Sequence, residues 1–253
     1  MTTHPALGAL ALGLASLLPA TGHAASASAR IDMSSFTVTL EDTSPNDGQG
    51  VSWMLDGPFG GRNTVAICAK STPCASWLPT VQEFSDDGDT GPAHATYGLS
   101  GLSATAHSGT DQMLASIQDT GNATWDWATA KRFGYLFFYG LGRATVQFDY
   151  TLEIDGGSEQ QPTSAWSSLV LRSGSDGDVL WQQQNSLVGG TNGPASKTGQ
   201  FTGSFDFTEG FLYSFTMNAG ADVAPSPVPE PMTAALALAG LGVVGLARRR
   251  RQA

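Results

Sequence analysis

The sequence predicts an all-β protein, in which one antiparallel β-sandwich or jelly-roll-like domain lies between two apolar chain ends. Apolar and polar residues alternate with period two in several segments, as in strands that have one face in a core and one in water. Helical periodicity is nearly absent between the ends, and Gly- and Asp-rich turns separate the short strands, which favours a sandwich over a parallel sheet. We place this domain, called the body, at residues 30–224.

The N-terminal segment predicts export. Residues Ala6 to Ala20 form an uncharged apolar run that is too short to span a membrane and has the length of a signal-peptide core. Small residues follow, and Ala25-Ser26-Ala27 gives a cleavage pattern to which Gly22-His23-Ala24 is a rival. We therefore expect a signal-peptide helix in residues 1–27, recognised by the secretion machinery and by signal peptidase. A buried apolar helix is the alternative.

The strands of the body are predicted from alternation. The longest is Thr145–Asp155, where one face is apolar throughout, and Gly156 ends it. Residues 204–208 and 211–217 alternate around a Gly-containing turn and predict a hairpin. A single turn of helix is predicted over residues 111–117. Further strands are expected near residues 36–41, 51–56, 64–69, 133–139, 167–172 and 179–183.

Cys68 and Cys74 are the only cysteines. An even count in an exported protein predicts a disulfide, and closing this short loop contributes about 2 kcal/mol. Two free thiols are the alternative. The spacing does not match the usual zinc pairs, so we expect no metal site and no cofactor.

Motifs for catalysis are missing from the sequence. It contains no nucleophile elbow and no P-loop, and His94 and His107 are expected as isolated surface residues. We therefore assign no catalytic residue. Trp125 and Trp127 would lie on one strand face about 6.8 Å apart, a spacing that suits stacking against sugars. The alternative is that both indoles pack in the core.

Charge limits the partners. Charged residues make up 13% of the chain, about half the usual share. Acidic residues number 22 against 12 basic ones, and four of the basic residues are Arg248, Arg249, Arg250 and Arg251 near the C-terminus. The rest of the chain is therefore strongly acidic and repels phosphate polymers, which predicts that no nucleic acid is a partner.

The C-terminal segment predicts a membrane anchor. Prolines recur at every second residue in 225–231, which makes this stretch an extended spacer. Residues 232–247 are uncharged and, as a helix, would span about 24 Å, which is less than the ~30 Å thickness of the hydrocarbon core. Arginine side chains that snorkel to the interface can make up the difference. Because positive charge stays cytoplasmic, Arg248–Arg251 should stop transfer and leave the body in the periplasm. We expect a transmembrane helix that holds the chain transiently in the inner membrane.

The order of these C-terminal features resembles a known family. Val228, Pro229, Glu230 and Pro231, then an apolar helix and an arginine cluster, are similar to the PEP-CTERM sorting domain of Gram-negative bacteria, over residues 228–253. The resemblance implies recognition of Pro229–Pro231 by an exosortase, a membrane protease-transpeptidase. It also implies export to the cell surface, often together with exopolysaccharide or biofilm. A plain C-terminal membrane anchor is the alternative.

A second, shorter resemblance lies in the body. The segment Phe36–Leu40 and the turn residues that follow it up to Gly48 are similar to a strand and turn of a recurring group of these surface proteins, a group that implies no particular activity. Together the features predict an exported, non-catalytic cell-surface or matrix protein. The alternative is a secreted carbohydrate-binding protein or polysaccharide-active enzyme, which would need two facing carboxylates in a cleft.

Overall fold

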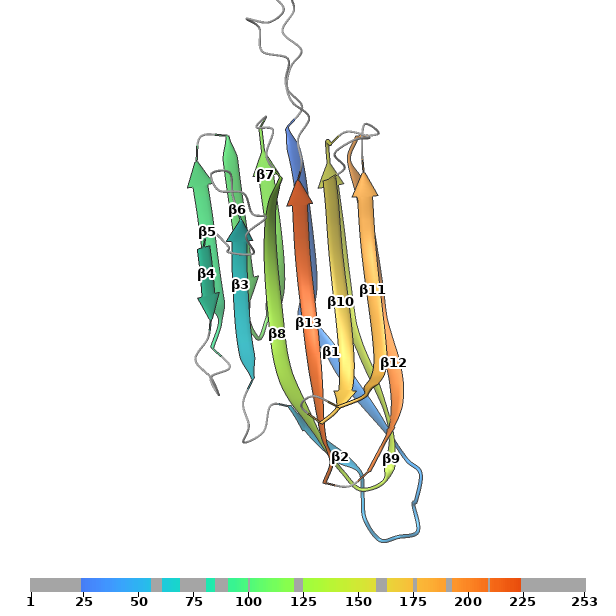
Figure 1. The fold of residues 1–253 in the computed structure, drawn as a ribbon. Helices are drawn as coiled ribbons and strands as arrows, with labels where there is room; N and C mark the ends of the chain where they lie inside the picture. The colour runs from blue at the N-terminus through green and yellow to red at the C-terminus, as the bar shows by residue number, and fades with distance from the viewer. Residues whose placement is uncertain are drawn as a thin grey trace, which may run out of the picture. The chain divides into compact units, whose positions relative to one another are not determined.

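The computed structural model describes residues 24–55, 61–68, 81–84, 91–99, 101–120, 125–157, 163–174, 177–189, 193–208 and 210–223. All the regular elements in these ranges are β-strands (Figure 1). The strands are β1 (Ala25–Asp42), β2 (Ser52–Leu55), β3 (Arg62–Cys68), β4 (Val81–Phe84), β5 (Ala93–Leu99), β6 (Leu102–Ser108), β7 (Gln112–Asp119), β8 (Asp126–Tyr139), β9 (Gly142–Asp155), β10 (Thr163–Ser173), β11 (Val179–Gly189), β12 (Ala195–Phe207) and β13 (Leu212–Val223).

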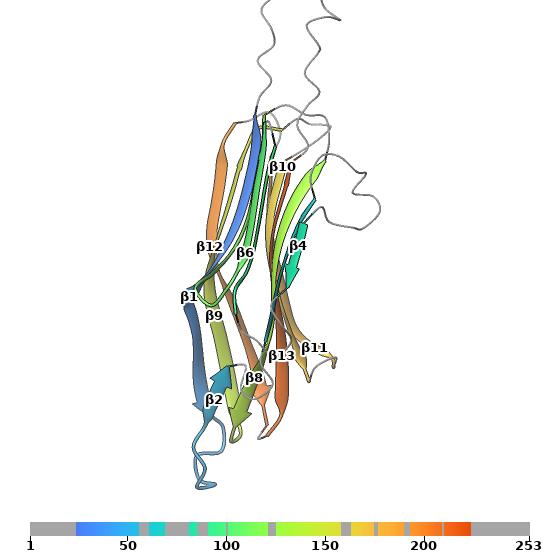
Figure 2. The same ribbon diagram turned by 90° about the vertical axis from the view of Figure 1, so that its left-hand side faces the viewer.

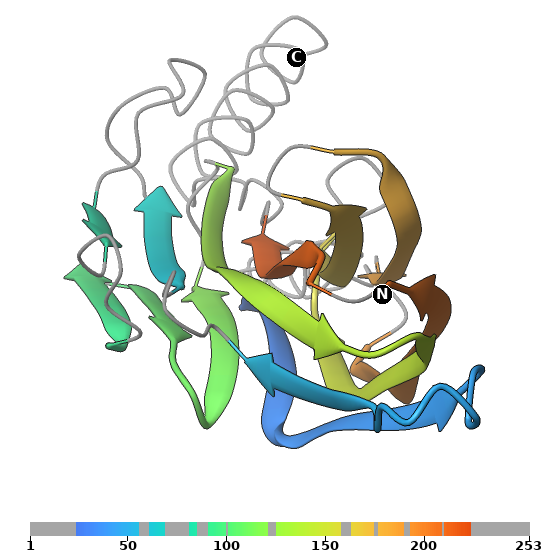
Figure 3. The same ribbon diagram turned by 90° about the horizontal axis from the view of Figure 1, so that it is seen from below.

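The strands form two antiparallel sheets packed as a sandwich. Sheet A has the order β12-β9-β1-β7-β6-β5, and sheet B has the order β11-β10-β13-β8-β3-β4. Figure 2 shows the two sheets as separate layers. The short β2 also belongs to sheet B and pairs with the end of β8, beyond the part of β8 that pairs with β3 (Figure 3). The predicted antiparallel sandwich is confirmed. The predicted C-terminal helix and residues 1–23 of the predicted N-terminal helix fall outside the described residues, whereas residues 25–27 of the latter are part of β1.

The core lies between the sheets and has two kinds of packing. Large rings fill one half, where Phe138 stacks on Phe207 at 4.6 Å and contacts Phe205 and Tyr213 at 5.5 and 5.4 Å between ring centroids. The other half contains many small side chains together with larger aliphatic ones such as Ile117 and Ile154. The buried alanines there include Ala25, Ala27, Ala29, Ala104, Ala106, Ala128, Ala130, Ala219 and Ala221. Alternation of buried and exposed residues runs through both halves, as the sequence predicts for half-buried strands.

The predicted hairpin of residues 204–208 and 211–217 is wrong. Both segments are strands, but β12 pairs with β9 in sheet A, while β13 pairs with β10 and β8 in sheet B. Each strand has an aromatic face, and the chain crosses between the sheets so that these faces meet. Phe205 and Tyr213 lie 5.3 Å apart across the core as a result. A hairpin would have put both apolar faces on the same side of one sheet.

Two other segments differ from the prediction. Residues 111–117 form no helical turn, because β7 runs from Gln112 to Asp119 and buries every second residue. β1 begins at Ala25, so it includes residues that the prediction left before the body. The alternating Ala and Ser of this stretch have low strand propensity by themselves. They form a strand because their alanines are buried in the alanine-rich half of the core.

The first strand of the sandwich begins, and its last strand ends, at the same end of the two sheets. Ala25, the first residue of β1, pairs with Asp119, the last residue of β7. Val223, the last residue of β13, pairs with Asp126, the first residue of β8. Figure 1 shows that β1 begins and β13 ends at the same end of the two sheets. The chain therefore enters and leaves the sandwich at one end.

Candidate functional site

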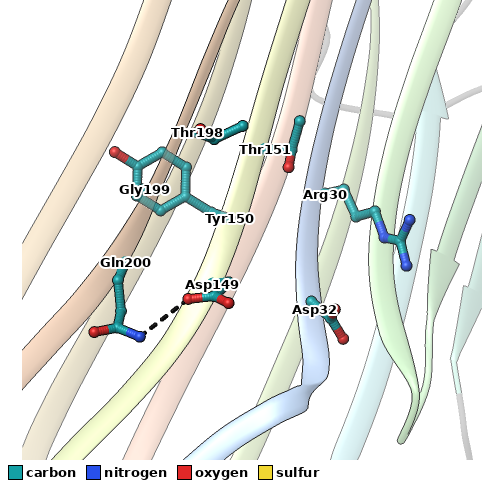
Figure 4. A pocket seen from close by; sticks show the side chains of 8 residues that line it. All are labelled: Arg30, Asp32, Asp149, Tyr150, Thr151, Thr198, Gly199 and Gln200. Carbon is teal, nitrogen blue, oxygen red and sulfur yellow. Dashed lines mark hydrogen bonds between the residues drawn. The ribbon is translucent and has the colours of Figure 1, made fainter.

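A hollow on the outer face of sheet A is a candidate site. It lies where β1, β9 and β12 run side by side and has a volume of about 580 Å³. We call it the polar groove, and Figure 4 shows its residues. They are Arg30, Asp32, Asp149, Tyr150, Thr151, Thr198, Gly199 and Gln200.

An irregularity in β1 shapes one end of the polar groove. The register between β1 and β9 shifts between Asp32 and Thr37, as in a β-bulge. Ser34 donates hydrogen bonds from its backbone N and its Oγ to Asp32 Oδ1, at 3.0 and 2.6 Å. Ser35 Oγ accepts a bond of 2.7 Å from the backbone N of Asp149. These bonds replace ladder bonds, so the bulge is fixed and β1 bends at the groove.

Two carboxylates face solvent in the polar groove. Asp32 and Asp149 are direct partners in the β1–β9 register and therefore lie on the same face of the sheet. Gln200 Nε2 donates to Asp149 Oδ1 at 3.1 Å. The hydrogen bonds from Ser34, helped by the charge of Arg30, hold the pKa of Asp32 below its usual value. Asp32 is therefore an ionised acceptor, suited to hydroxyl or cationic groups and poorly suited to donate a proton.

An aromatic ring forms part of the inner wall below the groove. Tyr150 is buried, and burial raises the pKa of its hydroxyl. Its ring lies against Gly199 on the neighbouring strand, where a Cβ would come within 2.6 Å of Tyr150 Oη. Any larger residue at position 199 would push this ring away. The ring supports the groove from inside and offers no exposed stacking surface.

The polar surface continues along the same strands. A second hollow of about 490 Å³ lies beside the polar groove and is lined mainly by β1, β7 and β9 with the start of β12. In it, Ser28 Oγ donates to Glu153 Oε2 at 3.3 Å. The outer face of sheet A therefore carries a strip of hydroxyl, amide and carboxylate groups, the groups that hydrogen-bond to hydroxyl-rich ligands.

The predicted tryptophans lie away from the polar groove. Trp125 precedes β8 and is 65% exposed. Trp127 is half-buried in β8 of sheet B, with Asp222 and Cys68 as its partners in the two neighbouring strands. Because the groove belongs to sheet A, the structure does not bring these rings and the two groove carboxylates together.

Asp222 is a partly buried acid on β13. Its Oδ2 accepts hydrogen bonds from Ser164 Oγ at 3.1 Å and from Trp166 Nε1 at 3.2 Å. Burial raises the pKa of this carboxyl, and the two hydrogen bonds oppose that shift only in part. The pairing of β13 with β8 places the acid beside Trp127, a neighbourhood that sequence spacing alone does not reveal.

The two histidines of the body are not isolated, contrary to the prediction. His94 and His107 are partners in the β5–β6 register, with ring centroids 5.8 Å apart. His107 Nε2 also lies 3.4 Å from Asp111 Oδ1. The pairing comes from strand register, so a search for helical or loop metal spacing misses it. Within the described ranges, no group of three or more His, Cys, Asp or Glu residues is placed to hold a metal ion.

Several predicted sites fall outside the described residues. These are Val228–Pro231, the apolar segment 232–247, Arg248–Arg251 and Cys74. Cys68 ends β3 with a buried side chain, and its bond to Cys74 stays a prediction. In the part of the chain that the structure describes, no helix has the length and hydrophobicity to cross a membrane.

Comparison with known proteins finds one match. Residues 227–251 match the family model of the PEP-CTERM protein-sorting motif. No curated protein and no solved structure matches the chain. The match covers the predicted motif and arginine cluster, so the resemblance of the C-terminal segment is confirmed.

Proposed function

We propose that this chain, an exported and cell-surface-associated protein that carries the PEP-CTERM sorting motif of exosortase substrates, is a non-catalytic surface or matrix protein. In this proposal signal peptidase removes the N-terminal segment, and residues 232–247 hold the chain transiently in the inner membrane. The exosortase then processes the tail at Val228–Pro231 while Arg248–Arg251 stay cytoplasmic. The β-sandwich reaches the cell surface and associates with exopolysaccharide.

The match of residues 227–251 is the observation that carries this proposal. The body supports a passive role, because the outer face of sheet A offers a polar strip for hydroxyl-rich polymer. Asp32 in the polar groove has a lowered pKa, the opposite of what a glycosidase needs in its general acid.

The sorting step is tested in a Gram-negative host that has an exosortase. Glu230→Ala, or deletion of Arg248–Arg251, should leave the full-length chain in the membrane fraction. Glu41→Ala removes the same charge from an exposed position of β1 and serves as the control, which should be processed like the wild type. Normal processing of both tail variants, measured by immunoblot of membrane and surface fractions, would refute the sorting role.

One observation favours a second candidate, a carbohydrate-binding protein or polysaccharide-active enzyme. Asp32 and Asp149 are neighbours on the same face of sheet A in an open groove, and glycosidases use a pair of carboxylates. A glycan array with the processed protein tests binding, and release of reducing ends tests hydrolysis. Hydrolysis that is lost in Asp149→Asn would establish the enzyme, whereas binding without hydrolysis would support the surface protein. Trp125→Ala tests the exposed indole as a sugar platform.

A further inference from the structure

We propose that signal peptidase cuts the bond between Ala24 and Ala25, so that the mature protein begins with the first residue of β1. This inference rests on the proposed function, since it requires export with a cleaved signal peptide. The sequence alone leaves two bonds open. The Gly22-His23-Ala24 pattern places the cut before Ala25, and the Ala25-Ser26-Ala27 pattern places it before Ser28.

Burial distinguishes the two bonds. Ala25 and Ala27 are 0% and 2% exposed and belong to the core that the two sheets enclose. A cut after Ala27 would remove both methyl groups and open the alanine-rich half of the core to water. A cut after Ala24 removes no residue of β1, because Ala24 precedes the strand and is exposed.

Strand pairing also favours the cut after Ala24 over the cut after Ala27. β1 lies inside sheet A, between β7 and β9. Ala25 pairs with Asp119, and Ala27 pairs with Ile117 on one side and Ile154 on the other. Losing these residues would leave backbone groups at the end of β7 and at the end of β9 without their partners in β1. A cut after Ala24 keeps all of these pairs.

The backbone at Ala25 packs closely against Gly156, the residue that follows β9. Gly156 follows β9 with a φ of +77°, a conformation that L side chains rarely adopt. A Cβ at this position would come within 3.0 Å of Ala25 Cα and still closer to the Ala24 carbonyl oxygen. The backbone at the junction of Ala24 and Ala25 therefore packs tightly against the turn after β9. A cut after Ala24 keeps the Ala25 part of this contact, whereas a cut after Ala27 removes all of it.

The test uses the full chain in an exporting Gram-negative host, with the processed protein purified and its N-terminus determined by sequencing and intact mass. The expected first residue is Ala25. Ser28, or any other first residue of a cleaved chain, would overturn this inference and leave the proposed export intact. A chain that keeps residues 1–24 would overturn both the cut and the signal-peptide step of the proposed function.

Two variants sharpen the result. Ala24→Leu places a large residue where the cleavage pattern needs a small one, so the product that begins at Ala25 should be lost. His23→Leu changes the variable position of the same pattern and is the matched control, which should be cut as the wild type is. An Ala24→Leu chain whose product is identical to the wild-type product would overturn the inference.

Discussion

Phe138 offers the sharpest test of how the two sheets hold together. Its side chain is 0% exposed and lies among three other rings, those of Phe205, Phe207 and Tyr213. Phe207 and Phe205 come from sheet A, whereas Phe138 and Tyr213 come from sheet B. Phe138→Ala would therefore remove the ring that contacts all three of the others and would leave a cavity between the two sheets.

The loss of stability expected for Phe138→Ala is large. Phe to Ala in a core lowers the free energy of unfolding by about 3–5 kcal/mol, and the ring contacts place this site in the upper part of that range. For a body of this size that corresponds to a fall in Tm of roughly 6–20 °C. Urea titration of the processed protein, followed by tryptophan fluorescence, measures the free energy directly.

Tyr139 is the matched control for this substitution. It is the next residue of β8, points to the other face of the sheet and is 45% exposed. Tyr139→Ala should change the free energy of unfolding by less than about 1 kcal/mol. A loss below about 1 kcal/mol for Phe138→Ala, or equal losses for both variants, would refute the packing of the sheets through these rings.

Three other predictions concern stability. Cys74→Ser should lower the free energy of unfolding by about 2 kcal/mol under oxidising conditions and have little effect in reductant; equal losses in both would argue against the disulfide. Gly220→Ala should destabilise by about 1–3 kcal/mol in a thermal melt, because the new Cβ would meet the Trp166 indole; an unchanged Tm would contradict this contact. Burial raises the pKa of Asp222, so its ionised form opposes folding above the folded-state pKa, and this cost disappears as the pH falls below the unfolded-state value. Asp222→Asn should therefore match or exceed the wild type in stability at pH 7, with an advantage that shrinks towards pH 4; urea titrations across this range that give a constant difference would exclude the linkage.

Sequence patterns predicted those strands that alternate large apolar and polar residues. Thr145–Asp155 lies within β9, and the predicted apolar face is the buried one. The same method missed Ala25–Ala29, because alternating Ala and Ser resembles the exit of a signal peptide and has little strand propensity. Burial of these alanines depends on the small residues of the facing sheet, a tertiary property that local sequence does not contain.

The candidate site was harder to predict than the fold. The polar groove combines residues of β1, β9 and β12, whose register is set by pairing between distant segments. Asp32 and Asp149 become neighbours only through that register. The same holds for His94 and His107, which meet across β5 and β6. The sorting motif, unlike the polar groove, was predictable from the sequence alone, because it consists of consecutive residues.

If the chain is tethered through its tail, as in the proposed function, the position of β13 has a mechanical consequence. β13 has 12 residues and lies between β10 and β8, with hydrogen bonds to both. Its last residue, Val223, directly precedes the segment that leads to the sorting motif. A pull along the strand would load these bonds in shear, because they run perpendicular to it and must break together. In the proposed tethered state, drag on the body would therefore load two hydrogen-bond ladders at once. These resist force better than the single ladder of an edge strand, whose bonds can break one by one.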